Sequence, residues 1–139
     1  MLVIRAAGMT APILASILAA CLLSLIAAFQ ASLALGMPFG HAAWGGMHRV
    51  LPPHLRVASA ISVAPLVLAI WIILSSTGIT TLPWQPATRR AGTWIGFALL
   101  ALNTVGNLAS KSRSERILMT PIAGVCALCY LLVALADYP

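Results

Sequence analysis

The chain has 139 residues, of which 61% are hydrophobic and 7% are charged, and its net charge is +6 because two acids stand against eight lysines and arginines. A water-soluble domain of this length cannot bury so many apolar side chains, whereas lipid hydrocarbon solvates them on every side. The basic residues stand in small groups between apolar stretches, which excludes a nucleic-acid-binding protein and indicates contact with anionic phospholipid headgroups of a lipid bilayer.

Four apolar stretches reach the length of about 20 residues that a helix needs to cross the hydrocarbon. The first ends before Gly36 and Pro38, which stop helices well. Residues 18–21 resemble a bacterial lipobox, but the apolar run continues past Cys21, so an intact helix is favoured over a lipidated cysteine. We predict an all-α, four-transmembrane-helix bundle in which 1–139 form a single membrane domain, with helices over residues 9–35, 57–77, 91–110 and 113–136.

The segment between the first two predicted helices, residues 36–56, is rich in Gly, Pro and His and is too long for a simple turn. Unpaired backbone is tolerated at membrane depth only when protein covers it. We therefore expect a structured, partly re-entrant loop with Trp44 at the headgroup level and with Arg49 and Arg56 bound to phosphates.

His41, His48 and His54 of this loop raise the alternative of a metal site. Their spacing matches no strict metal motif, and no carboxylate or cysteine stands beside them. Interfacial histidines that bind water and lipid phosphate are the preferred interpretation, and no cofactor is expected.

One face of the third predicted helix carries small and polar residues. Small residues let two helices approach closely, and carboxamides facing lipid would leave donors and acceptors unpaired, so this face is expected to contact protein. We interpret Asn103 and Asn107 as hydrogen-bonding across helices, with a ligand headgroup or a polar path as the alternative. The expected partners are Ser16, Gln30, Ser59 or Ser62, and the face itself consists of Gly92, Gly96, Asn103, Gly106, Asn107 and Ser110.

The fourth predicted helix begins at residue 113, because Ser112 and Glu115 have the spacing of a capping box. An early start places Pro121 inside the helix, where a kink is expected, as it is at Pro65 in the second helix. A start at Pro121 would leave too few residues to cross the membrane.

Four crossings bring the first and third loops to one side of the membrane. Lysines and arginines are more numerous on that side, which favours cytoplasmic loops and external termini, although Arg5 before the first helix argues for the opposite. Glu115 is expected to pair with a neighbouring arginine and so to tie the two loops together. With Asn103 as a further candidate, the polar cluster predicted at the loops is His41, His48, Arg49, His54, Arg56, Asn107, Lys111, Arg113, Glu115 and Arg116.

Three segments together, GMPFGHAAWGG, LPPHLRVASA and NLASKSRSERILMTP, resemble a family of small, uncharacterised four-helix membrane proteins of bacteria. The resemblance covers nearly the whole chain and implies a bacterial inner-membrane protein, without implying any activity. The residues that carry it are Gly36, Pro38, Gly40, Gly45, Gly46, Leu51, Pro52, Leu55, Arg56, Ser59, Asn107, Ser110, Ser112, Glu115, Arg116 and Pro121.

The leading functional hypothesis is an accessory or binding component that interacts with lipid, a hydrophobic ligand or a partner membrane protein. No catalytic constellation is evident, so an enzyme is disfavoured. One alternative is a small homo-oligomeric transporter or channel. A second is a redox enzyme that uses the histidines or Cys126 and Cys129, whose spacing superficially resembles thiol oxidoreductases of the vitamin K epoxide reductase type, but the loop cysteine pair of that family is absent and two apolar packing residues are favoured.

Overall fold

The computed structural model describes residues 2–136 of the chain, with the side chains of residues 10–136. This part of the chain is helical without any strand, which confirms the all-α class. Four of its helices are long and apolar enough to cross a membrane, as predicted. The elements are α1 (Leu2–Ala34), η1 (Gly40–Ala42), η2 (Trp44–Gly46), α2 (Pro53–Ser76), α3 (Pro86–Leu108), η3 (Glu115–Met119) and α4 (Thr120–Leu135).

Three helices begin earlier than expected: α1 at Leu2 instead of residue 9, and α2 and α3 at prolines. Pro53 and Pro86 lie in the first turns of α2 and α3, where the missing N–H of proline has no intrahelical partner to lose. Because the prediction started each helix at its first long apolar run, it left out the charged first turns that contain Arg56, Arg89 and Arg90. These turns extend the helices beyond their apolar stretches.

The fourth helix starts at residue 113, as predicted. Its second turn is η3, a π-helical turn that ends at Met119, just before Pro121. A proline leaves the carbonyl four residues earlier without its N–H partner, and π-helical turns are a common way for a helix to absorb such an irregularity. The expected distortion near Pro121 therefore takes this form.

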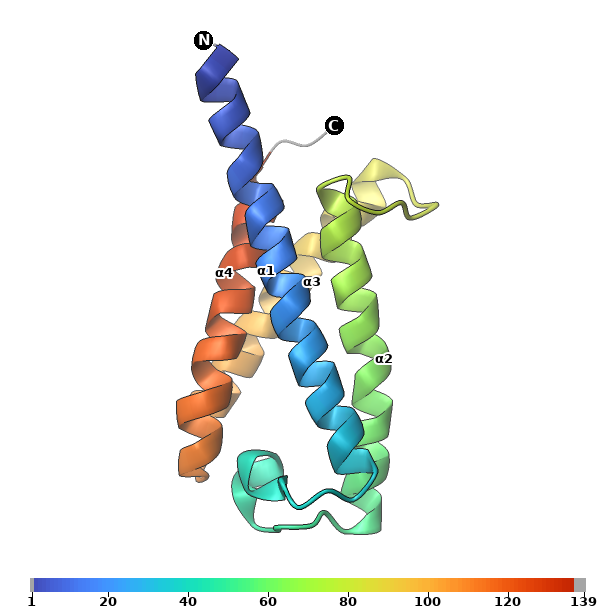
Figure 1. Cartoon of the computed structure of the whole chain (residues 1–139), viewed down its shortest axis with the longest axis vertical. Helices are drawn as coiled ribbons and strands as arrows, with labels where there is room; N and C mark the ends of the chain where they lie inside the picture. The colour runs from blue at the N-terminus through green and yellow to red at the C-terminus, as the bar shows by residue number, and fades with distance from the viewer. Residues whose placement is uncertain (1, 137–139) are drawn as a thin grey trace.

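The helices form two antiparallel pairs, α1 with α2 and α3 with α4, and the pairs pack on each other mainly through α1 and α4. Figure 1 shows α1 passing close to α4 in the upper half of the bundle, below which the two pairs diverge. The first loop folds under the open end between them. The loop between α2 and α3 lies at the opposite end.

Tyr130 of α4 lies at the centre of the main core. Its side chain is fully buried, and its hydroxyl donates a hydrogen bond to the carbonyl of Ala69 on α2 (2.6 Å). On α3, Gly96 faces the Tyr130 ring so closely that a methyl group at this position would overlap it. This contact confirms that the glycine end of the α3 face meets protein. The buried residues of this core are Ala15, Ala19, Leu23, Ile73, Cys126, Cys129, Tyr130 and Val133.

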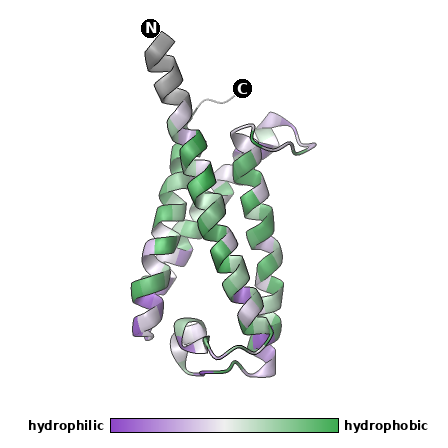
Figure 2. Cartoon of the chain, in the orientation of Figure 1, coloured by the Kyte–Doolittle hydropathy of each residue, from purple (hydrophilic) through white to green (hydrophobic). Residues whose placement is uncertain are grey.

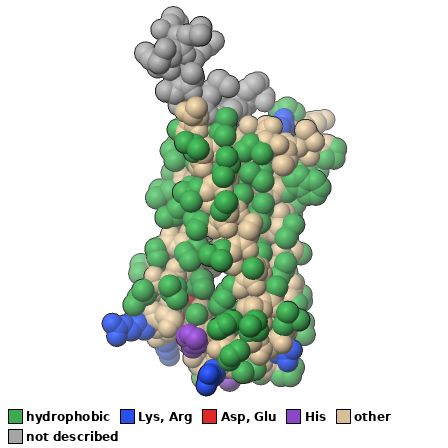
Figure 3. Space-filling model, in the orientation of Figure 1, with side chains coloured by type: hydrophobic (Ala, Val, Ile, Leu, Met, Phe, Trp, Pro, Cys, Tyr) green, Lys and Arg blue, Asp and Glu red, His purple; other side chains and the backbone are tan. Residues whose placement is uncertain are grey.

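The outer faces of α2 and α3 are apolar and exposed. Figure 2 shows hydrophobic residues along both sides of the helices, and Figure 3 shows histidine and most of the visible basic side chains at the end where the first loop lies. Apolar patches of this extent are unfavourable in water and match lipid hydrocarbon. The exposed large side chains include Val57, Ile61, Val67, Leu68 and Trp71 on α2, and Trp94, Ile95, Leu99, Leu102 and Val105 on α3.

Candidate binding chamber

The first loop closes on itself and on α2. Gly36 ends α1 in the left-handed region, with φ of +88°, and the Gly40 N–H donates to the Arg49 carbonyl (3.0 Å) across the loop. Trp44 also has a positive φ, of 53°, an uncommon conformation for a bulky residue. Its indole N–H donates to the buried hydroxyl of Ser59 (3.0 Å), and this hydrogen bond holds η2 against α2.

The start of the fourth helix holds the loop from the other side. Oε2 of Glu115 accepts hydrogen bonds from the Gly45 N–H (3.1 Å) and from the Ser110 hydroxyl (2.5 Å). The Ser112 hydroxyl accepts from the Glu115 N–H (3.2 Å) and donates to the His41 carbonyl (2.7 Å). Half of the predicted capping box is therefore present, while the carboxylate of Glu115 ties the two loops together.

The expected ion pair between Glu115 and an arginine does not form in the described part of the chain. Arg113 and Arg116 point outward and are exposed. Arg56 is half-buried, and its Nε donates to the carbonyl of Ala34 (2.9 Å). A cation at this place compensates the free carbonyls and partial negative charge at the end of α1, so Arg56 stabilises a helix terminus. Its predicted contact with phosphate stays a prediction.

A cavity of about 260 Å³ lies between the diverging helix pairs, next to the first loop. Figure 3 shows a hollow in the lower half of this face of the molecule. We call the cavity the polar chamber. Its lining comes from α1, the first loop, α2, α3 and η3, and consists of Ile26, Phe29, Gln30, Ala42, Ala43, Trp44, Ser62, Asn103, Asn107, Glu115 and Met119.

Three carboxamides line the polar chamber without a hydrogen-bond partner on their oxygens. Oε1 of Gln30 is buried and has none, and the side chains of Asn103 and Asn107 form no hydrogen bond with another described residue. The Ser62 hydroxyl donates a hydrogen bond to the Ala58 carbonyl (2.8 Å). A buried amide oxygen left unpaired costs about 1–3 kcal/mol, so this arrangement suits a bound group that donates hydrogen bonds.

The structure brings three of the predicted site residues together in the polar chamber: Asn103, Asn107 and Glu115. The other candidates do not line it, so only part of the predicted polar cluster surrounds this cavity. An unpaired cation is costly in an apolar interior, and long basic side chains reach outward to water and headgroups. Outside the lining lie the exposed His41, His48, Arg49, His54, Lys111, Arg113 and Arg116, and the half-buried Arg56.

Gln30, Ser62 and Trp44 line the polar chamber but were not predicted as site residues. The sequence contains a signal for Gln30, a carboxamide in an otherwise apolar span, and it was interpreted together with Ser62 as a structural partner of the α3 carboxamides. That pairing is absent among the described residues, and these side chains line the cavity instead.

The metal and redox alternatives find no support in the geometry. Within the described part of the chain, no group of three His, Cys, Asp or Glu side chains is arranged to hold a metal ion. Cys126 and Cys129 are free thiols packed in the main core, where a substrate has no access to them.

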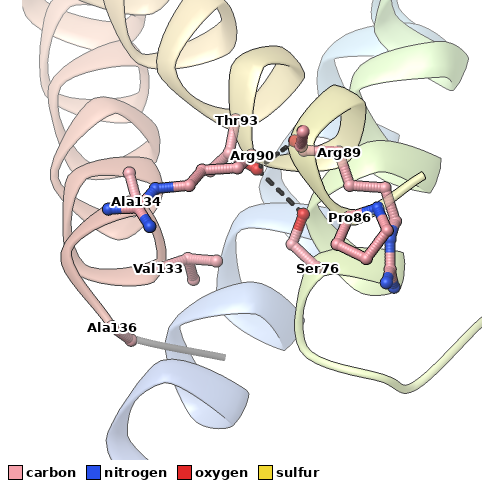
Figure 4. A pocket seen from close by; sticks show the side chains of 9 residues that line it. Ser76, Pro86, Arg89, Arg90, Thr93, Val133, Ala134 and Ala136 are labelled. Atoms are coloured by element: carbon pink, nitrogen blue, oxygen red, sulfur yellow. Dashed lines mark hydrogen bonds between the residues drawn. The ribbon is translucent and has the colours of Figure 1, made fainter. Parts of the chain in front are cut away.

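A second cavity, of about 360 Å³, lies at the opposite end of the bundle near the start of α3. Figure 4 shows that the guanidinium of Arg90 lies beside Ala134 of α4, whereas the Arg89 side chain extends the other way, past Pro86. Arg89 donates to the Ser75 carbonyl (3.1 Å). Since the two arginines diverge, they do not form a joint anion site.

The polar chamber can hold a small polar group, but it does not contain the pairing of nucleophile and base on which acyl or glycosyl transfer depends. Comparison with family models, with curated proteins and with solved structures finds no match for this chain.

Proposed function

We propose that this protein is a binding or accessory component of the bacterial inner membrane, which holds the polar group of an amphiphilic ligand in the polar chamber. The observation that carries the proposal is the Oε1 atom of Gln30, buried beside the cavity without a partner. Asn103 and Asn107 add hydrogen-bonding groups on the facing helix. Ile26, Phe29 and Met119 add apolar surface, which suits the part of a ligand that continues into hydrocarbon.

The size of the chamber limits what it binds. Its volume of about 260 Å³ is below the roughly 300–1,000 Å³ of sites that enclose a drug-sized molecule. A headgroup or a comparable small polar group fits, with its apolar chain outside the cavity in the lipid.

The geometry favours binding over transport. A transporter or channel needs a path through the whole bundle, whereas Tyr130, Cys126 and Leu23 belong to a packed core inside it. The exposed apolar faces of α2 and α3 are free for lipid, for a partner membrane protein or for a second copy of the chain. Flux measurements in liposomes would expose a transporter directly.

We infer a cytoplasmic location for the end of the molecule that carries the polar chamber. Arg49, Arg56, Lys111, Arg113 and Arg116 all belong to this end, and short cytoplasmic loops carry the excess of lysine and arginine in bacterial membranes. Reporter fusions test this orientation. Alkaline phosphatase fused after residue 82 should be active and after residue 110 inactive, and the reverse result would place the chamber outside.

The binding proposal is tested by purifying the full chain in a mild detergent and identifying co-purified compounds by mass spectrometry. The informative variant is Gln30→Met, which keeps the length of the side chain and removes its polar atoms. Gln85→Met is the matched control, because Gln85 is exposed at the opposite end and its side chain makes no capping hydrogen bond.

We expect a lipid or another hydrophobic compound to accompany the wild-type chain and Gln85→Met in a fixed ratio, and to be depleted from Gln30→Met. An identical set of compounds in all three preparations would overturn the proposal. The same samples also give the thermal stability. A ligand-free chamber predicts a more stable Gln30→Met variant, since the substitution removes a buried unpaired oxygen.

A further inference from the structure

The lining of the polar chamber has a definite electrostatic character. Glu115 is its one charged group among the described residues, and no lysine or arginine side chain lines it. A carboxylate is an acceptor only, and two hydrogen bonds to Oε2 leave Oε1 of Glu115 without a described partner. The chamber therefore repels a phosphate or a carboxylate and attracts a cation.

The hydrogen-bonding capacity of the chamber adds to this preference. The Trp44 indole N–H binds Ser59 and the Ser62 hydroxyl binds the Ala58 carbonyl, so the donors that remain in the lining side chains are the amide groups of the three carboxamides. The buried Oε1 of Gln30 needs a donor, and the carboxamide oxygens of the two lining asparagines can accept as well. A group with several N–H donors and a positive charge satisfies these acceptors together.

We infer that the polar chamber selects a primary ammonium group carried on an apolar chain. An ethanolamine phospholipid and a long-chain aliphatic amine share this chemistry. The surroundings also suit the phospholipid, because Lys111, Arg113 and Arg116 are exposed close to Glu115 in the sequence and offer partners for a phosphate outside the chamber. This inference rests on the proposed binding function and narrows it to a ligand class.

The test uses the full chain in a non-ionic detergent, with Trp71, Trp84 and Trp94 replaced by Phe so that emission reports on Trp44 in the chamber wall. The probes are dihexanoyl phospholipids that differ only in their headgroups, namely ethanolamine, choline and glycerol, together with dodecylamine and dodecyltrimethylammonium. Choline and the trimethylated amine keep the positive charge and lack N–H donors, so they are matched controls for hydrogen bonding.

We expect ethanolamine lipid, dodecylamine or both to bind at least about tenfold more tightly than their methylated counterparts, the order of effect of a hydrogen bond to a charged group. Glu115→Gln should weaken this binding by about tenfold or more, whereas Gln85→Met should not change it. A response to the lipid alone, or to the amine alone, identifies which source carries the ammonium group. If neither primary ammonium probe binds more tightly than its methylated counterpart, or if the glycerol lipid binds most tightly, the inference is overturned.

The Gln30→Met variant distinguishes a wrong ligand class from a wrong binding function. If Gln30→Met weakens a probe that lacks an ammonium group, the chamber binds ligands and its selectivity is assigned wrongly. If no probe responds to Gln30→Met, both statements fail. Asn103→Leu serves as a second variant if Glu115→Gln does not fold. The Asn103 side chain makes no hydrogen bond with another described residue, so this substitution breaks none. Unchanged ammonium binding by Asn103→Leu would then count against the inference.

Discussion

The ring of Tyr130 on α4 occupies the space that a side chain at Gly96 of α3 would need. The two helices approach closely at this point, and the Tyr130 hydroxyl donates a hydrogen bond to the Ala69 carbonyl of α2. One side chain thus connects three helices in the half of the molecule that contains the main core. The polar chamber lies next to the first loop, at the end toward which the helix pairs diverge in Figure 1.

Gly96→Ala should destabilise the protein by about 1–3 kcal/mol, the usual range for overpacking a filled interior. Its Cβ would overlap the Tyr130 ring, which is fixed by its own hydrogen bond. Gly106→Ala is the matched control on the same helix, because no heavy atom lies within 4 Å of the added methyl group. Thermal unfolding in detergent should show a lower midpoint for the first variant only, and equal midpoints would refute the close contact.

Glu115→Leu should release the first loop from the start of the fourth helix. The Gly45 N–H and the Ser110 hydroxyl both lose their acceptor. Hydrogen bonds to charged groups contribute about 1.5–3 kcal/mol, so amide exchange in residues 40–46 should accelerate by about tenfold or more. Mass spectrometry after deuterium labelling measures this exchange.

Arg113→Gln and Arg116→Gln are the controls for this experiment. Neither arginine is a partner of Glu115 in the described structure, so both variants should retain the slow exchange of the first loop. Fast exchange in either variant would show that an ion pair holds the loop, as the sequence alone had suggested.

The four spans and the start of the fourth helix were predictable because both depend on local sequence. An apolar run of sufficient length specifies a crossing without reference to any other helix. The capping interaction of Ser112 with the Glu115 N–H is local in the same way. The Glu115 side chain was assigned wrongly, because its partner Gly45 lies 70 residues away and competes with nearby arginines for the same carboxylate.

The polar chamber was only partly predictable. Helical periodicity placed Asn103 and Asn107 on one face, together with Gly96, and indicated that this face meets protein. Periodicity gives no information about the angle between helix pairs, and this angle decides whether the carboxamides meet Gln30 directly or face a cavity. The basic residues were assigned to the site because they are near Glu115 in sequence, but the length of their side chains carries them outward.

Arg56→Gln should lower the stability by about 1–2 kcal/mol, because it removes a charged hydrogen bond and a favourable charge from the end of α1. Arg49→Gln is the control, since Arg49 is exposed and contributes only its backbone carbonyl to the loop. Chemical or thermal unfolding in detergent compares the two. Equal losses would mean that net charge, and not the contact with the Ala34 carbonyl, determines the effect.

Gly45→Ala and Gly46→Ala should differ in their cost, although both glycines have a positive φ, of 78° and 72°. The left-handed conformation costs an alanine about 1–2 kcal/mol, and this term is common to the two variants. At Gly45 the added methyl group meets open space, whereas at Gly46 it would lie 2.7 Å from the Ser112 hydroxyl and 2.8 Å from the His41 carbonyl oxygen.

The excess destabilisation of Gly46→Ala over Gly45→Ala therefore measures how tightly the first loop is pressed against the start of the fourth helix. Ser112→Gly removes one of the two obstructing groups, so in that background the difference between the two alanine variants should shrink. The midpoints of thermal unfolding are compared for Gly45→Ala and Gly46→Ala, each with Ser112 present and with Ser112→Gly. If the difference is unchanged by Ser112→Gly, the His41 backbone alone confines Gly46, and the loops are joined through the backbone more than through the serine.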